Sequence, residues 1–382
     1  MINYGKHFID KNDINAVVSV LKNKALTQGQ ELNLFEKKLG QYFGSKYVIA
    51  VSSGTSALNL IAKFLKWKKN DIVFCSPITF SAGSNCIINQ GATPFFIDID
   101  LQTFNIDFKL IEKLLKNKNI RKKAKAIIAT DFAGNPCDWD FAKRIAKKYN
   151  LKLINDNCHA LGSSYKMKKN YATKYADFVV HSYHAVKNFT TGEGGAIFVN
   201  SKEEYKQIKL MRSHGIIKDI NKKKPWDSEM KLLGFNYRMT DIQAALGTSQ
   251  LKKLDIFVNK RQKIAEYYDL HFKDITKIQR QSVNKNNKSS YHLYPVLIDF
   301  KKINQTKEKL FSFFKKNNIN LQVHYKPTYK FNYYRKVKFL KCKSMKNSEI
   351  FYNQEVSLPI YVGLPKQTQI RVINFIKSFV LK

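Results

Sequence analysis

KYVIAVSSGTSALNLIAKFL, residues 46–65, joins a short apolar run to a second one through the turn SGTS. The first run, KYVIAVSS, has the length and the branched side chains of a buried strand. After the turn, apolar residues recur every three or four positions, which predicts a helix that begins at Thr55. A strand that passes through a tight turn into a helix is the repeating unit of α/β folds.

The same alternation continues along the chain. Further strand-like runs are DIVFCS, TPFFIDI, AKAIIATD, LKLIND, DFVVHS and GAIFVN, with helical patterns between them. Together with KYVIAVSS they predict a mostly parallel sheet that is covered by helices. We expect this large α/β domain to occupy residues 1–250.

A smaller domain is expected over residues 251–382. A helical stretch, residues 239–272, leads away from the sheet. Strands are predicted at YHLYPVLI and NLQVHYK and helices at 304–317 and 366–380, which together indicate an α+β fold. Since no Pro/Gly-rich linker separates the two parts, we expect them to pack together.

Composition places the chain among ordinary globular proteins. It has 382 residues, of which 44% are hydrophobic and 25% are charged. No apolar run reaches the roughly 18 residues of a membrane-spanning helix, and the first residues lack the apolar core of a signal peptide. The expected location is the cytoplasm. The five cysteines show no paired spacing, so neither disulfides nor a metal site is predicted.

The formal net charge of +38 would suit a protein that binds nucleic acid or a membrane surface. However, the basic residues are almost all lysine, whereas base recognition favours arginine. The lysines are also scattered through turn-like stretches such as KWKKN and NKKKPW. We therefore expect neither partner, although the positive field could attract an anionic substrate.

Polar residues follow several of the predicted strands, at the edge where α/β sheets bind ligands. In SGTSAL, Gly54 and Thr55 would lie at a helix amino terminus, which suits a phosphate but equally a simple helix cap. In INDNCHALG, Asp156 follows an apolar strand. It could cap the next turn, or it could hold a protonated ring nitrogen while His159 lies against the ring.

Lys187 lies five residues after Ser182 in HSYHAVKNFTTGEGG, residues 181–195. One lysine among so many is ordinarily surface charge. Near a sheet edge, however, a lysine with a lowered pKa can form an imine with a carbonyl and can transfer protons. The glycines after it permit a tight reversal before the next strand. A fourth polar stretch, GFNYRMTDIQAALG, carries Asn236 and Arg238 ahead of a long helix.

In this order, SGTSAL, ND..HALG, HSYHAVKNFTTGEGG and G.NYRMTDIQAALG resemble the DegT/DnrJ/EryC1/StrS sugar aminotransferases over nearly the whole chain. The resemblance implies the aspartate aminotransferase fold (fold type I), pyridoxal 5'-phosphate as cofactor and a homodimer with composite active sites. It implies that Lys187 is the Schiff-base lysine and that Asp156 pairs with the pyridine nitrogen. The other cofactor contacts that it implies are Gly54, Thr55, Phe80, His159, Ser182 and, from the neighbouring subunit, Asn236.

Three residues depart from the family's pattern. Asn155 stands where an acidic residue is common, and Asn157 and Cys158 replace small residues, but none of them is a group that the chemistry requires. The family also has a dehydratase branch in which a histidine replaces the lysine, and the presence of Lys187 argues against that activity. A basic regulatory or nucleic-acid-binding protein on an inactive transaminase scaffold is the alternative from another class.

Further stretches resemble the branch of the family that acts in pseudaminic-acid synthesis, namely LTQG, MRSHG, HLYPV, QVHYKP and SLPIY. This implies amination of carbon 4 of a UDP-linked 4-keto-6-deoxy-N-acetylhexosamine with glutamate as donor. Another nucleotide-linked 4-keto sugar is the alternative substrate. The substrate contacts that the resemblance implies are Tyr4, Lys24, Thr27, Arg238, His324, Tyr325 and Lys326.

Overall fold

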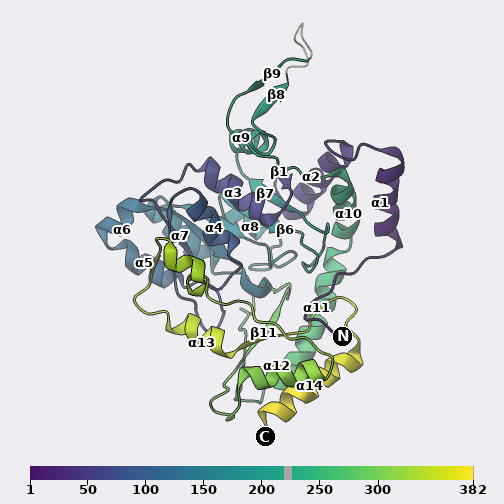
Figure 1. Ribbon diagram of the computed structural model, residues 1–382, viewed down its shortest axis with the longest axis vertical. Coiled ribbons are helices and arrows are strands. Elements are labelled where there is room, and N and C mark those ends of the chain that lie inside the picture. The colour runs from purple at the N-terminus through teal and green to yellow at the C-terminus, as the bar shows by residue number, and fades with distance from the viewer. Residues whose placement is uncertain (219–225, 382) are drawn as a thin grey trace.

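The computed structural model describes residues 1–218 and 226–381. Figure 1 shows a large sheet with its covering helices in the upper body, and β11, α12 and α14 below it near the carboxyl terminus. Within the described ranges, no helix combines the length and the apolar character needed to cross a bilayer. All the elements that position the functional site lie where these two parts meet.

The large sheet contains the seven strands that the sequence predicts and an eighth that it does not. Its order is β1-β7-β6-β5-β4-β2-β3-β12, and neighbours are parallel except that β7 runs antiparallel to β1 and β6. The predicted α/β class with a mostly parallel sheet is therefore confirmed. The strands are β1 (Tyr47–Val51), β2 (Ile72–Cys75), β3 (Thr93–Phe96), β4 (Ala124–Thr130), β5 (Lys152–Asp156), β6 (Phe178–Ser182), β7 (Gly195–Val199) and β12 (Leu340–Lys341).

Helix α3 (Gly54–Phe64) shows how the sequence starts the helices that cover this sheet. The Ser53 side chain accepts a hydrogen bond from Ser56 N at 3.0 Å, so Ser53 is the N-cap and the helix begins one residue before Thr55. The apolar residues of α3 join the main hydrophobic core. The other helices of this part are α1 (Lys11–Asn23), α2 (Gln30–Phe43), α4 (Ala82–Asn89), α5 (Phe108–Leu115), α6 (Lys118–Lys123), α7 (Trp139–Tyr149), α8 (Tyr171–Tyr175), α9 (Lys202–Arg212) and α10 (Asp241–Leu251).

A second, antiparallel sheet with the order β10-β11-β13 lies in the carboxyl-terminal part. Its strands pack with α11, α12 and α14 around a separate apolar cluster. The predicted connector helices and both predicted helices of this part are present. The elements are β10 (Ile278–Arg280), β11 (Tyr294–Ile298), β13 (Glu355–Leu358), α11 (Leu254–Phe272), α12 (Lys307–Lys316), α13 (Lys346–Gln354) and α14 (Lys366–Val380), with 3-10 turns at Thr328–Lys330 and Asn332–Lys336. A further 3-10 turn, Phe132–Gly134, follows β4 in the large-sheet part.

The strand predicted at NLQVHYK, residues 320–326, is wrong. This segment makes only an isolated bridge, between Gln322 and Ser357. Its N–H groups bind side chains in place of a neighbouring strand, because Val323 N donates to the Gln322 side chain at 3.0 Å and His324 N donates to Glu355 at 2.9 Å. The alternation of apolar and polar residues in this segment therefore does not reflect strand pairing.

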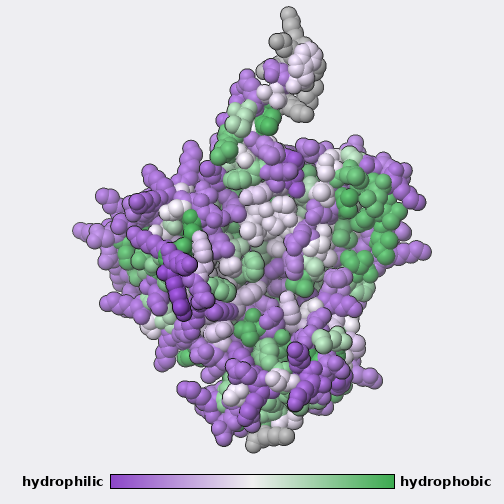
Figure 2. Space-filling model, in the orientation of Figure 1, coloured by the Kyte–Doolittle hydropathy of each residue, from purple (hydrophilic) through white to green (hydrophobic). Residues whose placement is uncertain are grey.

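A hairpin of β8 (Ile216–Lys218) and β9 (Ser228–Met230), which the sequence did not predict, projects from the top of the molecule (Figure 1). On another part of the surface, Figure 2 shows hydrophobic residues gathered over α1. Ile14, Val18 and Leu21 recur there at helical spacing and are 37 to 56% exposed. An amphipathic helix that turns apolar side chains outward has a face available for association.

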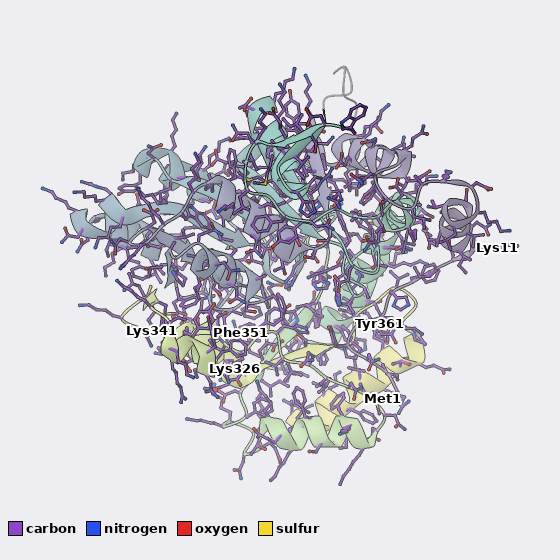
Figure 3. All side chains as sticks on the ribbon, turned by 45° about the horizontal axis from the view of Figure 1, so that its top comes forward. Met1, Lys11, Lys326, Lys341, Phe351 and Tyr361 are labelled. Carbon is purple, nitrogen blue, oxygen red and sulfur yellow. The ribbon has the colours of Figure 1, made fainter. Side chains whose placement is uncertain are left out.

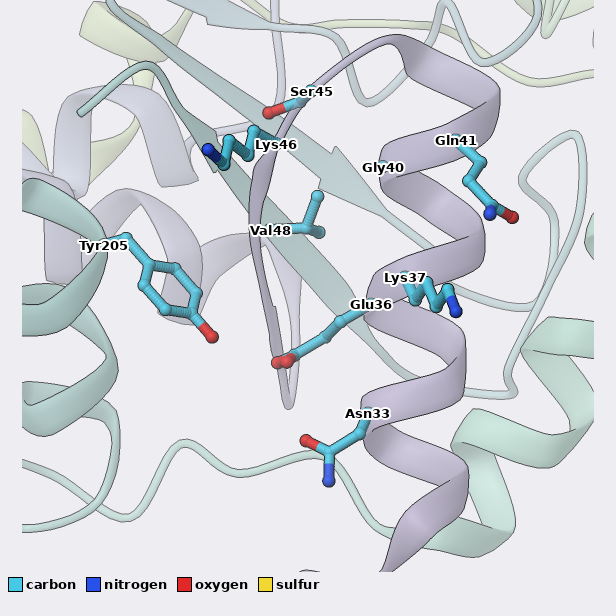
Figure 4. A pocket seen from close by; sticks show the side chains of 9 residues that line it. All are labelled: Asn33, Glu36, Lys37, Gly40, Gln41, Ser45, Lys46, Val48 and Tyr205. Carbon is cyan, nitrogen blue, oxygen red and sulfur yellow. The ribbon is translucent and has the colours of Figure 1, made fainter. Parts of the chain in front are cut away.

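A groove of about 480 Å³ lies between α2, β1 and α9, where Tyr205 faces α2 (Figure 4). None of the predicted site residues lines it. Glu36 accepts hydrogen bonds from Arg212 Nη1 at 2.8 Å and from Ala50 N at 2.9 Å, and both members of this ion pair are more than 90% buried. Such a pair fixes how α2 and α9 sit against β1, so we assign it a structural role.

Candidate active site

The candidate site lies at the carboxyl ends of three neighbouring strands. Thr130, Asp156 and Ser182 are the last residues of β4, β5 and β6, and the parallel register sets Thr130 directly beside Asp156. Lys187 follows in the loop that joins β6 to β7. This is the edge at which α/β sheets bind ligands, as the sequence predicts.

Asp156 is 6% exposed and is held by two hydrogen bonds. Thr130 Oγ1 donates to Oδ2 and the Cys158 backbone N–H donates to Oδ1, both at 3.3 Å. These two bonds fix the plane of the carboxylate at the end of the central strand. Because few donors reach it from the protein, it remains able to bind a protonated group of a ligand.

Lys187 is a partly buried ammonium without an ion-pair partner. The loss of water around it lowers the pKa of Lys187, against the opposing charge of Asp156. Within the described chain, no carboxylate oxygen comes within the 4.0 Å of an ion pair with Nζ. The hydrogen-bonding neighbour of Nζ is His292 Nε2 at 3.5 Å. A lysine that is partly withdrawn from water and has no ion-pair partner is costly for folding, which indicates a chemical role.

His159 is 2% exposed and stays neutral, because burial holds its pKa well below the usual value and Lys187 adds to this effect. Ala133 N donates to Nδ1 at 3.4 Å, so the ring proton lies on Nε2, which is 3.1 Å from the Tyr325 hydroxyl. The ring is also stacked with Tyr325, with centroids 6.0 Å apart. The imidazole plane is thus fixed beside Lys187.

The amino terminus of α3 completes this edge of the site. A Cβ atom on Gly54 would lie 3.0 Å from Ser182 Cβ, so the helix start and the end of β6 are in contact. Gly195 packs just as closely, because a Cβ there would lie 2.5 Å from the Ser53 carbonyl carbon. The first N–H groups of a helix have no partner within it, and Thr55 is exposed beside them. Backbone N–H groups with two hydroxyls suit a phosphate.

The carboxyl-terminal part brings further predicted residues to the same place. Tyr325 contacts His159, and its ring lies 6.4 Å from Phe80, which is 59% exposed. His324 packs edge-on against Tyr4 with centroids 4.8 Å apart. Burial lowers the pKa of His324, and the charge of Lys187 adds to this effect.

Five predicted residues are not brought into this cluster by any hydrogen bond, ion pair or ring contact within residues 1–218 and 226–381. Lys24 forms an ion pair with Glu31, and Lys326, labelled in Figure 3, lies over the Phe331 ring at 5.4 Å. The other three make isolated backbone bridges, Thr27 with Thr240, Arg238 with Val51 and Asn236 with Ser213.

Two of the three departures from the family pattern share one partner, the fully buried Asp131. Asn155 and Asn157 donate to Asp131 Oδ2 at 3.1 and 2.9 Å, and the Tyr171 hydroxyl donates to the same atom at 2.7 Å. An acidic residue at position 155 would face this carboxylate, so the amide is the compatible choice here. The two amides also anchor the backbone on each side of Asp156.

Sequence reasoning did not assign a role to His292, the residue that contacts Lys187. It is 4% exposed, its pKa is held well below the usual value by burial, and its Nδ1 has no hydrogen-bond partner in the described chain. The signal was available, because His292 is a histidine that lies two residues before the apolar strand β11. Its distance from Lys187 along the chain concealed the contact.

The residues of this site fit pyridoxal phosphate. That cofactor needs an amine for covalent attachment, an acid at the ring nitrogen, a flat neighbour and an anion cradle. Asp156 and His159 are buried beside the partly buried Lys187, and Gly54 and Ser182 meet at a helix amino terminus. The unpaired Lys187 ammonium is the feature that a bound aldehyde would explain.

Comparisons with known proteins agree with this description. The model of the DegT/DnrJ/EryC1/StrS aminotransferase family matches residues 7–377. A Campylobacter jejuni protein named UDP-4-amino-4,6-dideoxy-N-acetyl-beta-L-altrosamine transaminase is 41% identical over 379 residues, which cover 99% of this chain and 96% of that protein. A Helicobacter pylori protein of the same name is 38% identical over 364 residues, covering 94% and 93%.

Two solved structures are similar over the whole chain. One is Helicobacter pylori PseC, an aminotransferase involved in the biosynthesis of pseudoaminic acid, with a TM-score of 0.91, 35% identity and coverage of 100% of this chain and 99% of that one. The other is the putative sugar aminotransferase Spr1654 from Streptococcus pneumoniae in its PMP form, with a TM-score of 0.90, 28% identity and the same coverage. Both therefore share the fold described above.

Proposed function

Because the chain belongs to the DegT/DnrJ/EryC1/StrS aminotransferase family, we propose that it aminates carbon 4 of a UDP-linked 4-keto-6-deoxy-N-acetylhexosamine, with pyridoxal phosphate as cofactor and glutamate as donor. The product would enter pseudaminic-acid synthesis, as the names of its relatives suggest. The single observation that carries the activity is the partly buried and unpaired Lys187 beside Asp156 and His159.

When bound, pyridoxal phosphate supplies an aldehyde carbon that exchanges amines and a protonated ring that withdraws electrons from the substrate. Lys187 would hold it covalently and Asp156 would face its ring nitrogen. His159 would cover the ring, and the amino terminus of α3 with Ser182 would bind the phosphate. Asp156 keeps the ring nitrogen protonated because a buried carboxylate stabilises a neighbouring positive charge.

Lys187, once free, takes a proton from the substrate carbon and returns it in the second half of the reaction. A base must be neutral to accept a proton, and the lowered pKa of Lys187 increases the fraction that is neutral. His292 Nε2, at 3.5 Å, orients the amine. Since burial keeps His292 neutral, it adds no second positive charge beside the amine.

Tyr4, His324 and Tyr325 support the sugar side of the proposal, because they surround the space next to Lys187. The remaining contacts that we propose, Lys24, Thr27, Arg238 and Lys326, would have to reach the substrate from the surface or from another subunit. The positive charges of Lys24, Arg238 and Lys326 match the two phosphates of a UDP-sugar.

The test is an assay of the purified, cofactor-loaded protein against a panel of nucleotide-linked 4-keto sugars. We expect amination of the UDP-linked N-acetylhexosamine derivative, with one 2-oxoglutarate formed from glutamate per amino sugar. A protein that aminated only dTDP-linked or GDP-linked sugars would contradict the assignment of the substrate. A protein that aminated none, although loaded with cofactor, would contradict the activity.

We further propose that the enzyme is a homodimer whose active sites are composite. Asn236 is exposed and would reach the phosphate of the neighbouring subunit. The apolar face of α1, with Ile14, Val18 and Leu21, offers a surface that a second copy would bury (Figure 2). A two-fold axis would place each surface against its equivalent.

Mixing two inactive variants tests this composite site. In a mixed dimer of Lys187→Ala and Asn236→Trp, one site carries both lesions and the other carries none. Random pairing of equal amounts should restore about one quarter of wild-type activity, since half the dimers are mixed and each has one intact site. The control is a mixture of Lys187→Ala and Asp156→Asn. These two residues serve the same site from the same chain, so a mixed dimer has no intact site and activity should not be restored. If the first mixture stayed inactive after proven subunit exchange, Asn236 would serve its own chain or no site.

We also propose that the chain divides into a large domain, residues 1–250, and a small domain, residues 251–382. The separate apolar cluster around α11, α12 and α14 supports this division. Two contacts cross this division. Ile2 of the large domain bridges to Ile319 of the small domain, and β12 of the small domain joins the large sheet. The two domains would therefore move as tightly coupled bodies.

A further inference from the structure

Glu355, Ser357 and His324 form a buried cluster on the small-domain side of the site. Glu355 and Ser357 are fully buried and His324 is 5% exposed. The first two are separated by one residue on β13, so both side chains point to the same face of the strand. The backbone bridge between Gln322 and Ser357 brings His324 over that face.

The hydrogen bonds of this cluster determine which nitrogen of His324 carries the proton. Glu355 Oε2 accepts from the His324 backbone N–H at 2.9 Å, and Glu355 Oε1 accepts from the Ser357 hydroxyl at 2.6 Å. Ser357 Oγ lies 2.9 Å from His324 Nδ1. Since the one hydroxyl hydrogen is given to the carboxylate, Ser357 can only accept from His324, and Nδ1 must carry the proton.

The other nitrogen of His324, Nε2, is then a hydrogen-bond acceptor. Burial, with a smaller effect of the Lys187 charge, lowers the pKa of His324 to about 3, so the ring is neutral at ordinary pH. Nε2 has no hydrogen-bond partner among the residues that the structure describes. The His324 ring lies between Tyr4 and Tyr325, with centroids at 4.8 and 4.9 Å.

Building on the proposed function, we propose that ionised Glu355, acting through the Ser357 hydroxyl, holds His324 in the tautomer whose Nε2 accepts a hydrogen bond from a hydroxyl or amide N–H of the nucleotide sugar. Glu355 and Ser357 are positioning residues, because they act through His324 and do not touch the substrate. A sugar rich in hydroxyl donors is the class of ligand that such an acceptor recognises.

We call the hydrogen bonds that run from residue 355 through the Ser357 hydroxyl to His324 the relay. Glu355→Gln reverses the direction of these hydrogen bonds while preserving the shape of the side chain. The amide oxygen of Gln must accept from the His324 backbone N–H, because the amide nitrogen would oppose that donor. The amide nitrogen then donates to Ser357 Oγ, and the hydroxyl hydrogen turns to His324 Nδ1. The ring proton moves to Nε2, so a donor faces the substrate where an acceptor stood.

Solid-state nitrogen-15 spectra of histidine-labelled protein test the relay directly, with His324 assigned from the signals lost in His324→Asn. At pH 9 we expect protonated Nδ1 in the wild type and protonated Nε2 in Glu355→Gln. Glu349→Gln, a change of the same kind in the same part of the chain that does not contact His324, should resemble the wild type. An unchanged His324 tautomer in Glu355→Gln would overturn the proposal. Should that variant misfold, Ser357→Ala replaces it and should give a mixture of tautomers.

The relay also predicts a pH dependence. Burial raises the pKa of Glu355 to about 8, against the Ser357 hydrogen bond, the charge of Lys307 on α12 and the His324 N–H. Below this pH the protonated Glu355 carboxyl donates to Ser357, as the amide does in Glu355→Gln, and the His324 proton moves to Nε2. Above this pH the carboxylate is ionised, and Nε2 of His324 is the hydrogen-bond acceptor. The wild-type spectra should therefore change between pH 6 and pH 9, whereas those of Glu355→Gln should not. Tyr4 and Tyr325, the other titratable groups here, have pKa values raised by burial and stay neutral.

Kinetics connect the relay to the substrate. At pH 9 we expect Glu355→Gln to raise the KM for the nucleotide sugar roughly 10-fold or more, with the KM for the amino donor unchanged. Equal effects on both substrates would contradict a role in sugar recognition. If the wild type aminated no nucleotide sugar, the proposed function would be contradicted. The nitrogen-15 spectra would then be the only test of the relay.

Discussion

Lys187→Ala is expected to abolish covalent retention of the cofactor and to lower transamination by roughly 10³-fold or more. Its amine is the one that the structure places among Asp156, His159 and His292, and no other lysine contacts these residues in the described chain. An alanine removes both the attachment point and the base. The cofactor should still bind through the other groups, but it should leave on dialysis.

Intact mass after borohydride reduction measures this directly. The wild type should gain the mass of one reduced cofactor per chain, and Lys187→Ala should gain none. Lys116→Ala, which removes an exposed lysine on the surface, is the matched control and should behave as the wild type. Because the variant removes a partly buried and unpaired ammonium, its melting temperature without cofactor should equal or exceed that of the wild type. A borohydride-stable adduct on Lys187→Ala would place the attachment elsewhere.

Asp156→Asn should leave the cofactor attached and slow both half-reactions by roughly 10²- to 10³-fold. The amide is neutral and cannot stabilise a proton on the ring nitrogen, which both half-reactions need. The substitution is compatible with the local hydrogen bonds. The Asn oxygen can accept from Cys158 N, and the Thr130 hydroxyl can rotate to accept from the new amide.

Single-turnover rates with the amino donor alone and with the keto sugar alone separate the two half-reactions. Both should fall together in Asp156→Asn, because the ring nitrogen takes part in each. Asp138→Asn, which alters the exposed N-cap of α7, is the control and should leave both rates unchanged. Unimpaired turnover in Asp156→Asn would mean that the carboxylate serves only to hold the turn that follows β5.

The sequence predicts the parts of the site that local patterns determine. Asp156 and Ser182 end apolar runs that could only be buried strands, so their place at the sheet edge follows from the fold class, and Lys187 follows from its distance to Ser182. Contacts between distant segments leave no such local signal. His292 meets Lys187 across 105 residues of sequence, and Glu355 meets the His324 backbone across 31.

The same limit explains the strand wrongly predicted at residues 320–326. Its alternation of apolar and polar residues is real, but the pattern does not reveal that a carboxylate from β13 takes a backbone N–H that a strand would give to its neighbour. In a similar way, Asn155 and Asn157 looked like departures from a family pattern. They are the partners of Asp131, and that pairing becomes visible only when β4 and β5 lie side by side.

The short strand β12, which belongs to the small domain, also protects the edge of the large sheet. In the large sheet, β3 would otherwise be the outermost strand, with a row of unpaired N–H and C=O groups open to any other extended chain. Leu340 and Lys341 pair with Phe95 and Phe96 and cover that edge, and only two residues of β12 are then presented to the outside, one of them a lysine. Protection of the fold against chain-to-chain sheet growth therefore depends on a segment that is synthesised almost 250 residues after the strand it shields.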